Sequence, residues 1–260
     1  MSLIRDILIL CFLTVVVIFT LFYLRREGFI DYQDNNVSFM TKDQTYKFLH
    51  NDLDGYIANL SPIDLYARKV NSSNTYRLRA ANSALDFSND LKMKLVSAVK
   101  TSNRLLEKIR IEKINCSEIA SMPWIFALTD SNLYEDGLPH TRANVIFISS
   151  TMDQSHNNLV KTLIHEKIHI YQRAHPDEIS FYLESKGYIK SKHGQGIPYI
   201  RSNPDLDGWI YYSPVTKKEM AAYYSSDEPS SITDITLTDP SFEHPYELMA
   251  YTITEKVISN

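Results

Sequence analysis

The strongest apolar pattern in the chain is the uncharged run ILILCFLTVVVIFTLFYL near the N-terminus, which spans residues 7–24. It shows no polar face, and as a helix it is about 27 Å long, close to the hydrocarbon thickness of a bilayer. The run ends in YLRR rather than in the small residues of a signal-peptide cleavage site. The pattern therefore predicts a retained transmembrane helix in an N-terminal anchor, residues 1–26, of a single-pass membrane protein.

Basic residues flank this run on both sides: Arg5 precedes it, and Arg25, Arg26, Lys42 and Lys47 follow it. Their excess after the run favours a body on the cytoplasmic side of the membrane. The mixed polar sequence of residues 27–45 is typical of a juxtamembrane linker. We therefore expect the folded body to span residues 46–260.

Helical and strand patterns follow one another within the body. Apolar residues recur at helical spacing over residues 75–114, without Gly or Pro, and predict one or two long helices. The runs WIFALT, residues 124–129, and NVIFISS, residues 144–150, predict two strands. We expect the second of these to be an edge strand, to which an extended peptide could add, beside a helix over residues 157–173. The element order predicts an α+β fold, mainly helical with a small sheet.

The composition is that of a globular protein, because 44% of the 260 residues are hydrophobic and 22% are charged. The formal net charge of −4, with scattered Lys and Arg, argues against a nucleic-acid partner. Only two cysteines occur, Cys11 and Cys116, so a disulfide framework and a thiolate zinc site are excluded. Any metal site in this chain has to rely on histidines and carboxylates.

The helical pattern over residues 157–173 contains the sequence HEKIH, in which His165 and His169 are four positions apart. Residues at this spacing lie one above the other on a helix, so both imidazoles point the same way and Glu166 projects beside them. The apolar residues available to bury the rest of the helix are Leu159, Leu163, Ile164 and Ile168. The pattern indicates a metal held by two imidazoles, with two surface histidines on an amphipathic helix as the alternative.

A catalytic metal needs a third protein ligand, for which the chain offers several candidates. His175 has the spacing of the zinc-binding pattern H-E-x-x-H-x-x-G-x-x-H, but Gln172 stands where that pattern needs glycine. Without the turn that glycine permits, His175 would continue the helix and point away. Glu247 follows Pro245, which suits the first turn of a second helix. The remaining alternatives are Asp205 and Glu184.

These motifs resemble those of the zincin metallopeptidases. Glu247, with the small Ala250 after it, resembles the gluzincin subset, in which a glutamate from a second helix completes the zinc site. The segments PHTRANVIFIS, TLIHEKIHIYQR, RSNPD and EHPYELMAY, in this order, are similar to predicted membrane-linked metallopeptidases of large DNA viruses. The interval between the two motifs is longer than in thermolysin-like members, which implies an insertion over residues 176–243.

The resemblance implies one Zn²⁺ per chain, bound by His165, His169 and Glu247, with Glu166 as general base toward a zinc-activated water. It implies a membrane-anchored zinc metallopeptidase with a zincin-like fold, which hydrolyses protein or peptide substrates at a viral or host internal membrane. The alternative is a non-catalytic membrane or virion structural protein that keeps this fold as an interaction module. Glu166 favours the enzyme, because a structural metal site needs no general base.

Two further residues are candidates for stabilising the oxyanion of a tetrahedral intermediate. These are His140, ahead of the second predicted strand, and Tyr251, one turn after Glu247. A structural histidine in a turn and a core tyrosine are the respective alternatives. Candidates for lining a cleft or orienting a ligand are Arg201, Asn203 and Asp205 of RSNPD, for which a turn around Pro204 is the alternative.

Overall fold

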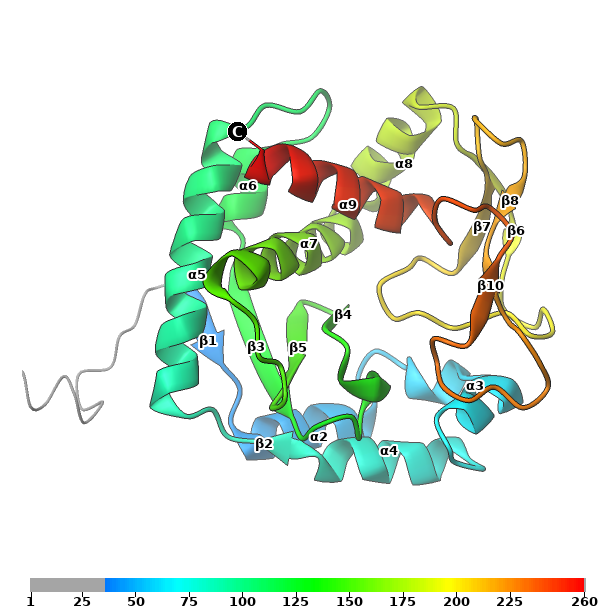
Figure 1. The fold of residues 1–260 in the computed structure, drawn as a ribbon, viewed down its shortest axis with the longest axis horizontal. Coiled ribbons are helices and arrows are strands. Elements are labelled where there is room, and N and C mark those ends of the chain that lie inside the picture. The colour runs from blue at the N-terminus through cyan, green and yellow to red at the C-terminus, as the bar shows by residue number, and fades with distance from the viewer. Residues whose placement is uncertain (1–35, 260) are drawn as a thin grey trace, which may run out of the picture. The chain divides into compact units, whose positions relative to one another are not determined.

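The structure, a computed structural model, describes residues 36–259, which belong to one folded unit (Figure 1). The anchor predicted over residues 1–26, with its bilayer segment over residues 7–24, lies outside the described residues. In the described part of the chain, no helix is long and apolar enough to cross a membrane.

A mixed sheet of five strands lies at the centre of the fold. Its strands are β1 (Val37–Phe39), β2 (Ala84–Leu85), β3 (Trp124–Thr129), β4 (His140–Arg142) and β5 (Val145–Ser149). β3 pairs in parallel with β1 and with β5. Two pairings are antiparallel: β4 with β5, and β2 with β3. β3 and β5 confirm the two predicted strands. The expectation that β5 would be the edge strand is wrong, because β4 lies beyond it.

The fold also begins earlier than expected, since residues 37–45 are not a linker. Val37–Phe39 pairs with β3 as strand β1, and a helix begins at Lys42. Thr41 caps that helix, because its hydroxyl accepts a hydrogen bond from the Gln44 N–H while the Gln44 side chain accepts one from the Thr41 N–H. Tertiary pairing and this capping box order a segment whose polar composition suggested a linker.

The helices of the body are α2 (Lys42–Asn51), α3 (Pro62–Ala67), α4 (Ser73–Asn82), α5 (Asn89–Lys108), α6 (Cys116–Ser121), α7 (His156–Ala174), α8 (Pro176–Ser185) and α9 (Pro245–Ile258). α4 and α5, separated by β2, account for the predicted helical region of residues 75–114.

Side chains that alternate along β3 and β5 face two different cores, as the pleat of a strand requires. Phe126, Leu128, Ile146 and Ile148 pack with residues of α5, α7 and α9. Ala127, Val145 and Phe147 pack with residues of α2 and α4. The sheet is therefore covered on both faces, with α7 and α9 on the same side of it (Figure 1).

Residues 176–243, expected as an insertion, form α8 and two small sheets. One contains β6 (Ile189–His193), β7 (Trp209–Tyr212) and β8 (Glu219–Met220), and the other contains β9 (Ala222–Tyr224) and β10 (Ile235–Leu237). Both lie toward the C-terminal end of α7 (Figure 1). Short 3-10 helices occupy Ile57–Asn59 and Glu135–Gly137.

A buried ion pair ties the N-terminal helices to the loop before β4. The Arg68 guanidinium donates two hydrogen bonds to Glu135, from Nε to Oε1 at 2.9 Å and from Nη2 to Oε2 at 2.7 Å. Burial alone would raise the pKa of Glu135, but Arg68 lowers it to about 2. Since the unfolded value is about 4.3, this stabilisation is present at neutral pH and is lost as the pH falls from about 4 toward 2.

Truncation of this pair is expected to destabilise the protein strongly. Arg68→Ala leaves the Glu135 carboxylate buried and without its counter-ion, which should lower the free energy of unfolding by about 3–5 kcal/mol. Lys47→Ala is the control, because Lys47 pairs with Asp43 where both side chains are about two-thirds exposed (67% and 69%), and it should cost less than about 1 kcal/mol. Urea unfolding measures both, and equal losses would contradict a structural role for the buried pair.

Candidate metal centre

Helix α7 begins after Ser155, whose hydroxyl accepts a hydrogen bond from the Asn158 N–H. The residues predicted to bury its apolar face, Leu159, Leu163, Ile164 and Ile168, are all buried. The helix ends at Ala174, because the next residue, His175, precedes a proline and leaves the helical conformation. His175 Nε2 lies 3.2 Å from Glu118 Oε1. This ring is therefore engaged away from His165 and His169.

Helix α9 presents Glu247 from its first turn. The His244 ring caps the helix by accepting a hydrogen bond from the Tyr246 N–H at 3.1 Å, and Pro245 occupies the first helical position. Ala250, one turn after Glu247, is fully buried. Its small side chain suits the close packing of α9 on α7.

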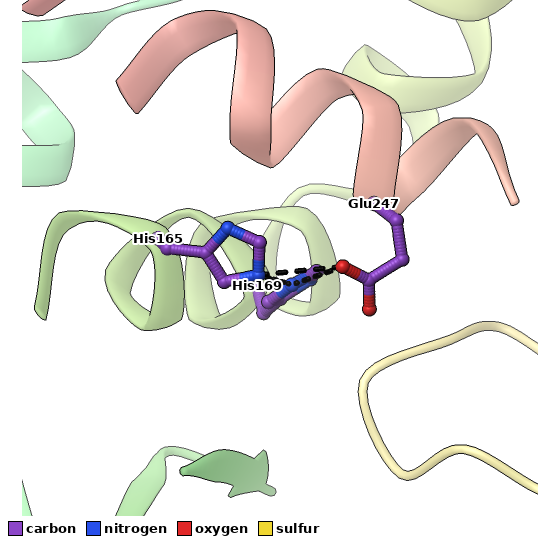
Figure 2. Close-up of side chains that lie close together, drawn as sticks. All are labelled: His165, His169 and Glu247. Atoms are coloured by element: carbon purple, nitrogen blue, oxygen red, sulfur yellow. Dashed lines mark hydrogen bonds and ion pairs between the residues drawn. The ribbon is translucent and has the colours of Figure 1, made fainter. Parts of the chain in front are cut away.

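Figure 2 shows that His165, His169 and Glu247 point toward one another from α7 and α9. The two Nε2 atoms are 3.0 Å apart. Glu247 Oε2 lies 3.3 Å from Nε2 of His165 and 3.7 Å from Nε2 of His169. Ligand atoms about 2.0–2.1 Å from a tetrahedral zinc lie about 3.3–3.4 Å from one another. The three atoms are thus spaced as zinc ligands are, and two imidazoles with a carboxylate are a donor set that suits zinc.

Gln172 determines which nitrogen of His169 can bind a metal. The Gln172 side-chain NH₂ donates to the Tyr246 carbonyl at 3.0 Å, so its Oε1 is the atom that faces His169 Nδ1, at 2.8 Å. A carbonyl oxygen only accepts, and Nδ1 therefore carries a proton. In the neutral ring, this leaves the Nε2 lone pair for a metal. Gln172 also joins the two helices that carry the ligands.

Replacement of Gln172 should weaken the metal site without removing a ligand. Gln172→Ala frees the His169 ring to rotate and change tautomer, so we expect the zinc affinity to fall by about 10- to 100-fold. Competition with a chromophoric chelator measures this. Gln154→Ala is the control, since Gln154 lines the cleft that also contains His165 and Glu247. Among the described residues, its side chain accepts a hydrogen bond from the Thr162 hydroxyl and none from His169. An unchanged affinity in Gln172→Ala would show that the hydrogen bond does not orient the ligand.

Asn203 performs a comparable function for Glu247. Its side-chain NH₂ donates to Glu243 Oε1 at 2.8 Å and to Glu247 Oε1 at 3.2 Å, while its Oδ1 accepts from the Asp205 N–H. Glu247 thereby has one oxygen hydrogen-bonded and the other, Oε2, facing the imidazoles. Arg201 pairs with Glu243 and so neutralises the charge of that neighbouring carboxylate.

The electrostatics of the ligands link metal binding to proton release. Burial would lower the pKa of His169, but the carboxylates of Glu247 and Asp205 raise it to about 10. Burial would likewise raise the pKa of Glu247, whereas His169 and His165 hold it well below its usual range. A metal ion therefore has to displace a proton from His169.

Glu166 lies beside the ligands and lines the same cleft. It is only 4% exposed, and its Oε2 is buried without a hydrogen-bond partner in the described part of the chain. Burial raises the pKa of Glu166 well above its usual range, and the carboxylates of Asp205 and Glu247 raise it further. A buried carboxyl oxygen without a hydrogen-bond partner destabilises the fold. A group retained at such a cost is typical of a functional residue rather than a structural one.

His140 lines the cleft, and the chain just before β4 holds its ring. Its Nδ1 lies 2.9 Å from the Leu138 carbonyl, which can only accept, so Nδ1 carries the proton. Burial lowers the pKa of His140 despite the nearby carboxylates of Glu135 and Asp205, which favours the neutral ring. The remaining nitrogen, Nε2, is buried without a hydrogen-bond partner among the described residues, and it would donate to an oxyanion only in the protonated ring.

Tyr251 remains a candidate donor. It is 50% exposed, lines the cleft, and packs its ring edge-on against His165 with centroids 4.5 Å apart. Burial and the Glu247 carboxylate raise its pKa, so the phenol keeps its proton at neutral pH. The cleft that it shares with His165 and Glu247 has a volume of about 570 Å³, which suits a small ligand or a short peptide segment.

The other candidates for a third ligand lie outside the cluster. Asp205 accepts from the N–H and the hydroxyl of Thr141, at 2.7 and 2.6 Å. Glu184 is an exposed residue of α8 that accepts from Ser180. As the sequence suggested, Arg201, Asn203 and Asp205 line the cleft.

Sequence reasoning missed the role of Gln172, which it treated only as a departure from a glycine pattern. A signal was present, because Gln172 follows His169 by three positions and so lies on the same helix face.

Comparison with protein families, curated proteins and solved structures found no match to this chain.

Proposed function

We propose that this protein is a zinc-dependent metallopeptidase of the zincin type, anchored in a membrane by residues 7–24. The observation that carries the proposal is the convergence of His165 Nε2, His169 Nε2 and Glu247 Oε2, with Glu166 in the same cleft. His165, His169 and Glu247 would hold the zinc, in the gluzincin arrangement. Three protein ligands leave a coordination position open for water or substrate.

Zinc at this position would lower the pKa of a bound water to about 7 and polarise a peptide carbonyl. Glu166 would accept the proton of the attacking water on its carboxylate and deliver it to the nitrogen of the leaving amine. Tyr251 would donate its phenolic O–H to the oxygen of the carbonyl under attack. Gln172 and Asn203 would keep His169 and Glu247 oriented throughout.

The experiment that tests this function uses the full chain in detergent and a diverse library of unstructured peptides. We expect hydrolysis with zinc, loss of hydrolysis with a chelator, and recovery when zinc is returned. A protein that retains one zinc per chain and hydrolyses nothing would instead support the non-catalytic interaction module.

The membrane anchor is a separate prediction. Carbonate extraction should leave the full chain in the membrane pellet, because an apolar helix of this length inserts stably, whereas a chain that lacks residues 7–24 should appear in the soluble fraction. A native chain that begins after Arg26 and is soluble would show that the segment is a cleaved signal peptide.

A further inference from the structure

Strand β10 lines the cleft with alternate residues. Ile235 and Leu237 belong to the lining, and Thr236 between them does not. Residues two positions apart on a strand have their side chains on one face and their backbone N–H and C=O groups at one edge. β10 is also the last strand before α9, the helix that carries Glu247. The same side of β10 therefore lies along the cleft that contains this ligand.

The backbone of β10 bonds to β9 through the positions that do not line the cleft. The Asp234 carbonyl accepts from the Ser225 N–H at 3.1 Å, and the Thr238 N–H donates to the Ala221 carbonyl at 3.0 Å. In an antiparallel pair the backbone groups of every second residue point to the partner, so Thr236 faces β9 as well. The two residues that line the cleft therefore direct their backbone groups away from β9, to what we call the outer edge.

Three backbone groups at the outer edge are available to a ligand. The Ile235 N–H is used, because it donates to the Thr233 carbonyl at 3.0 Å. Within the described residues, no hydrogen bond outside the β9–β10 pairing uses the Ile235 C=O or the N–H and C=O of Leu237, and no strand pairs with β10 on this side. Such an edge is a template for a further strand.

Two neighbouring edges are already bonded within the chain. On the far side of β9, the Arg201 N–H donates to the Ala222 carbonyl at 2.9 Å. On edge strand β4 of the central sheet, the Thr141 N–H donates to Asp205 Oδ1 at 2.7 Å. Strand addition at this cleft is therefore favoured at β10 rather than at these two edges.

Aromatic contacts join the segment after β10 to the metal ligands. The Phe242 ring packs on Tyr251 with centroids 5.2 Å apart, and Tyr251 packs on His165 at 4.5 Å. All three residues line the cleft together with β10. A peptide that lies along β10 would therefore share one continuous cleft with the metal centre.

We propose that β10 binds the substrate as an added strand, through the open backbone groups of Ile235 and Leu237. This inference rests on the proposed function and specifies its substrate class: extended, unstructured peptide segments, recognised through their backbone. Substrate side chains that face the cleft would contact the apolar side chains of Ile235 and Leu237. A folded segment, whose backbone groups are bonded internally, would not pair with this edge.

The test uses the zinc-loaded full chain and one cleavable peptide, made in versions with a single N-methyl group on each successive amide except the scissile one. An N-methyl group removes the N–H donor and adds bulk, so it should matter where the amide faces β10. The carbonyls of Ile235 and Leu237 accept from two substrate amides separated by one. We expect kcat/KM to fall by about tenfold at these two amides and by less than about twofold at the amide between them.

Similar losses at consecutive amides, or no loss at any, would overturn the inference while leaving the proposed function intact. If the unmethylated peptide and the others of a diverse library are not hydrolysed in a zinc-dependent manner, the proposed function has failed, and the inference falls with it. The two failures are therefore distinguishable.

A pair of variants tests whether β10 is the strand that binds. Leu237→Ala shortens the side chain and keeps the backbone N–H, whereas Leu237→Pro also removes this donor. Because the N–H points away from β9, proline should leave the pairing of β9 and β10 intact. We expect kcat/KM in Leu237→Pro to be about 3- to 10-fold lower than in Leu237→Ala. N-methylation of the two sensitive amides should also cost less in the proline variant, since both changes disrupt the same pairing.

Thermal melting and zinc content report on the fold of each variant. An unchanged N-methyl pattern in a folded Leu237→Pro variant would overturn the assignment to β10. If the proline variant does not fold, crosslinking of the unmodified protein decides, with a photoreactive leucine placed in the peptide between the two sensitive amides. Crosslinks to residues 235–237 are expected, and crosslinks confined to other strands would overturn the assignment.

Discussion

Glu166→Gln is expected to retain its zinc and to lose peptide hydrolysis by a factor of about 10² to 10⁴. The amide has nearly the size and shape of the carboxylate but cannot accept the proton of the attacking water. Glu166 is not among the three convergent ligands, so the zinc content should stay at one per chain. The fold should also persist, because the amide replaces a buried carboxyl group whose Oε2 has no hydrogen-bond partner among the described residues.

His165→Ala is the matched comparison for this variant. It removes one imidazole from a three-ligand site, so both zinc and hydrolysis should be lost. Metal analysis and peptide cleavage, measured on the same preparations, separate the two effects. If Glu166→Gln and the unmodified protein cleave at the same rate, Glu166 is not the base.

Glu247→Ala should weaken zinc binding more than any change outside the ligand set. Since replacement of a group that only orients a ligand costs about 10- to 100-fold in affinity, loss of the ligand itself should cost more than about 100-fold. His175→Ala tests the alternative that the sequence left open. His175 lies at the end of α7, where its ring contacts Glu118 of α6, so zinc affinity should be unchanged.

Chelator competition on both variants distinguishes the two assignments. Full zinc affinity in Glu247→Ala, together with a loss in His175→Ala, would contradict the gluzincin arrangement. Thermal melting without metal shows whether either substitution acts through the fold, because His175 also lies at the junction of α7 and α8.

The elements that carry the ligands could be predicted because their signals are local. Ser155 caps α7 and Pro245 begins α9, while the spacing of His165 and His169 places both on one helix face. The strands β3 and β5 were predictable from their apolar runs. The α+β class followed from the order of these segments.

The edge strand could not be predicted, because β4 is only three residues long and carries no alternating apolar pattern. Its turn into β5 begins at Ala143, which adopts a positive φ of 50° without the glycine that usually marks such a turn. The start of the fold at β1 was hidden for a similar reason, since Val37–Phe39 becomes a strand only through its pairing with β3.

The contacts that orient the ligands depend on tertiary structure to different degrees. Gln172 lies on the helix of His169, and its face could be read from the spacing. Asn203 reaches Glu247 across 44 residues of sequence, from a segment whose path follows from buried contacts with Asp64 and Thr141. No local pattern encodes that path.

The most direct test of the metal centre is a crystal structure of the zinc-loaded protein, with anomalous diffraction measured at the zinc absorption edge. The account predicts one strong anomalous peak per chain, about 2.0–2.2 Å from Nε2 of His165, Nε2 of His169 and a carboxylate oxygen of Glu247. A peak at His175, or no peak between α7 and α9, would contradict it.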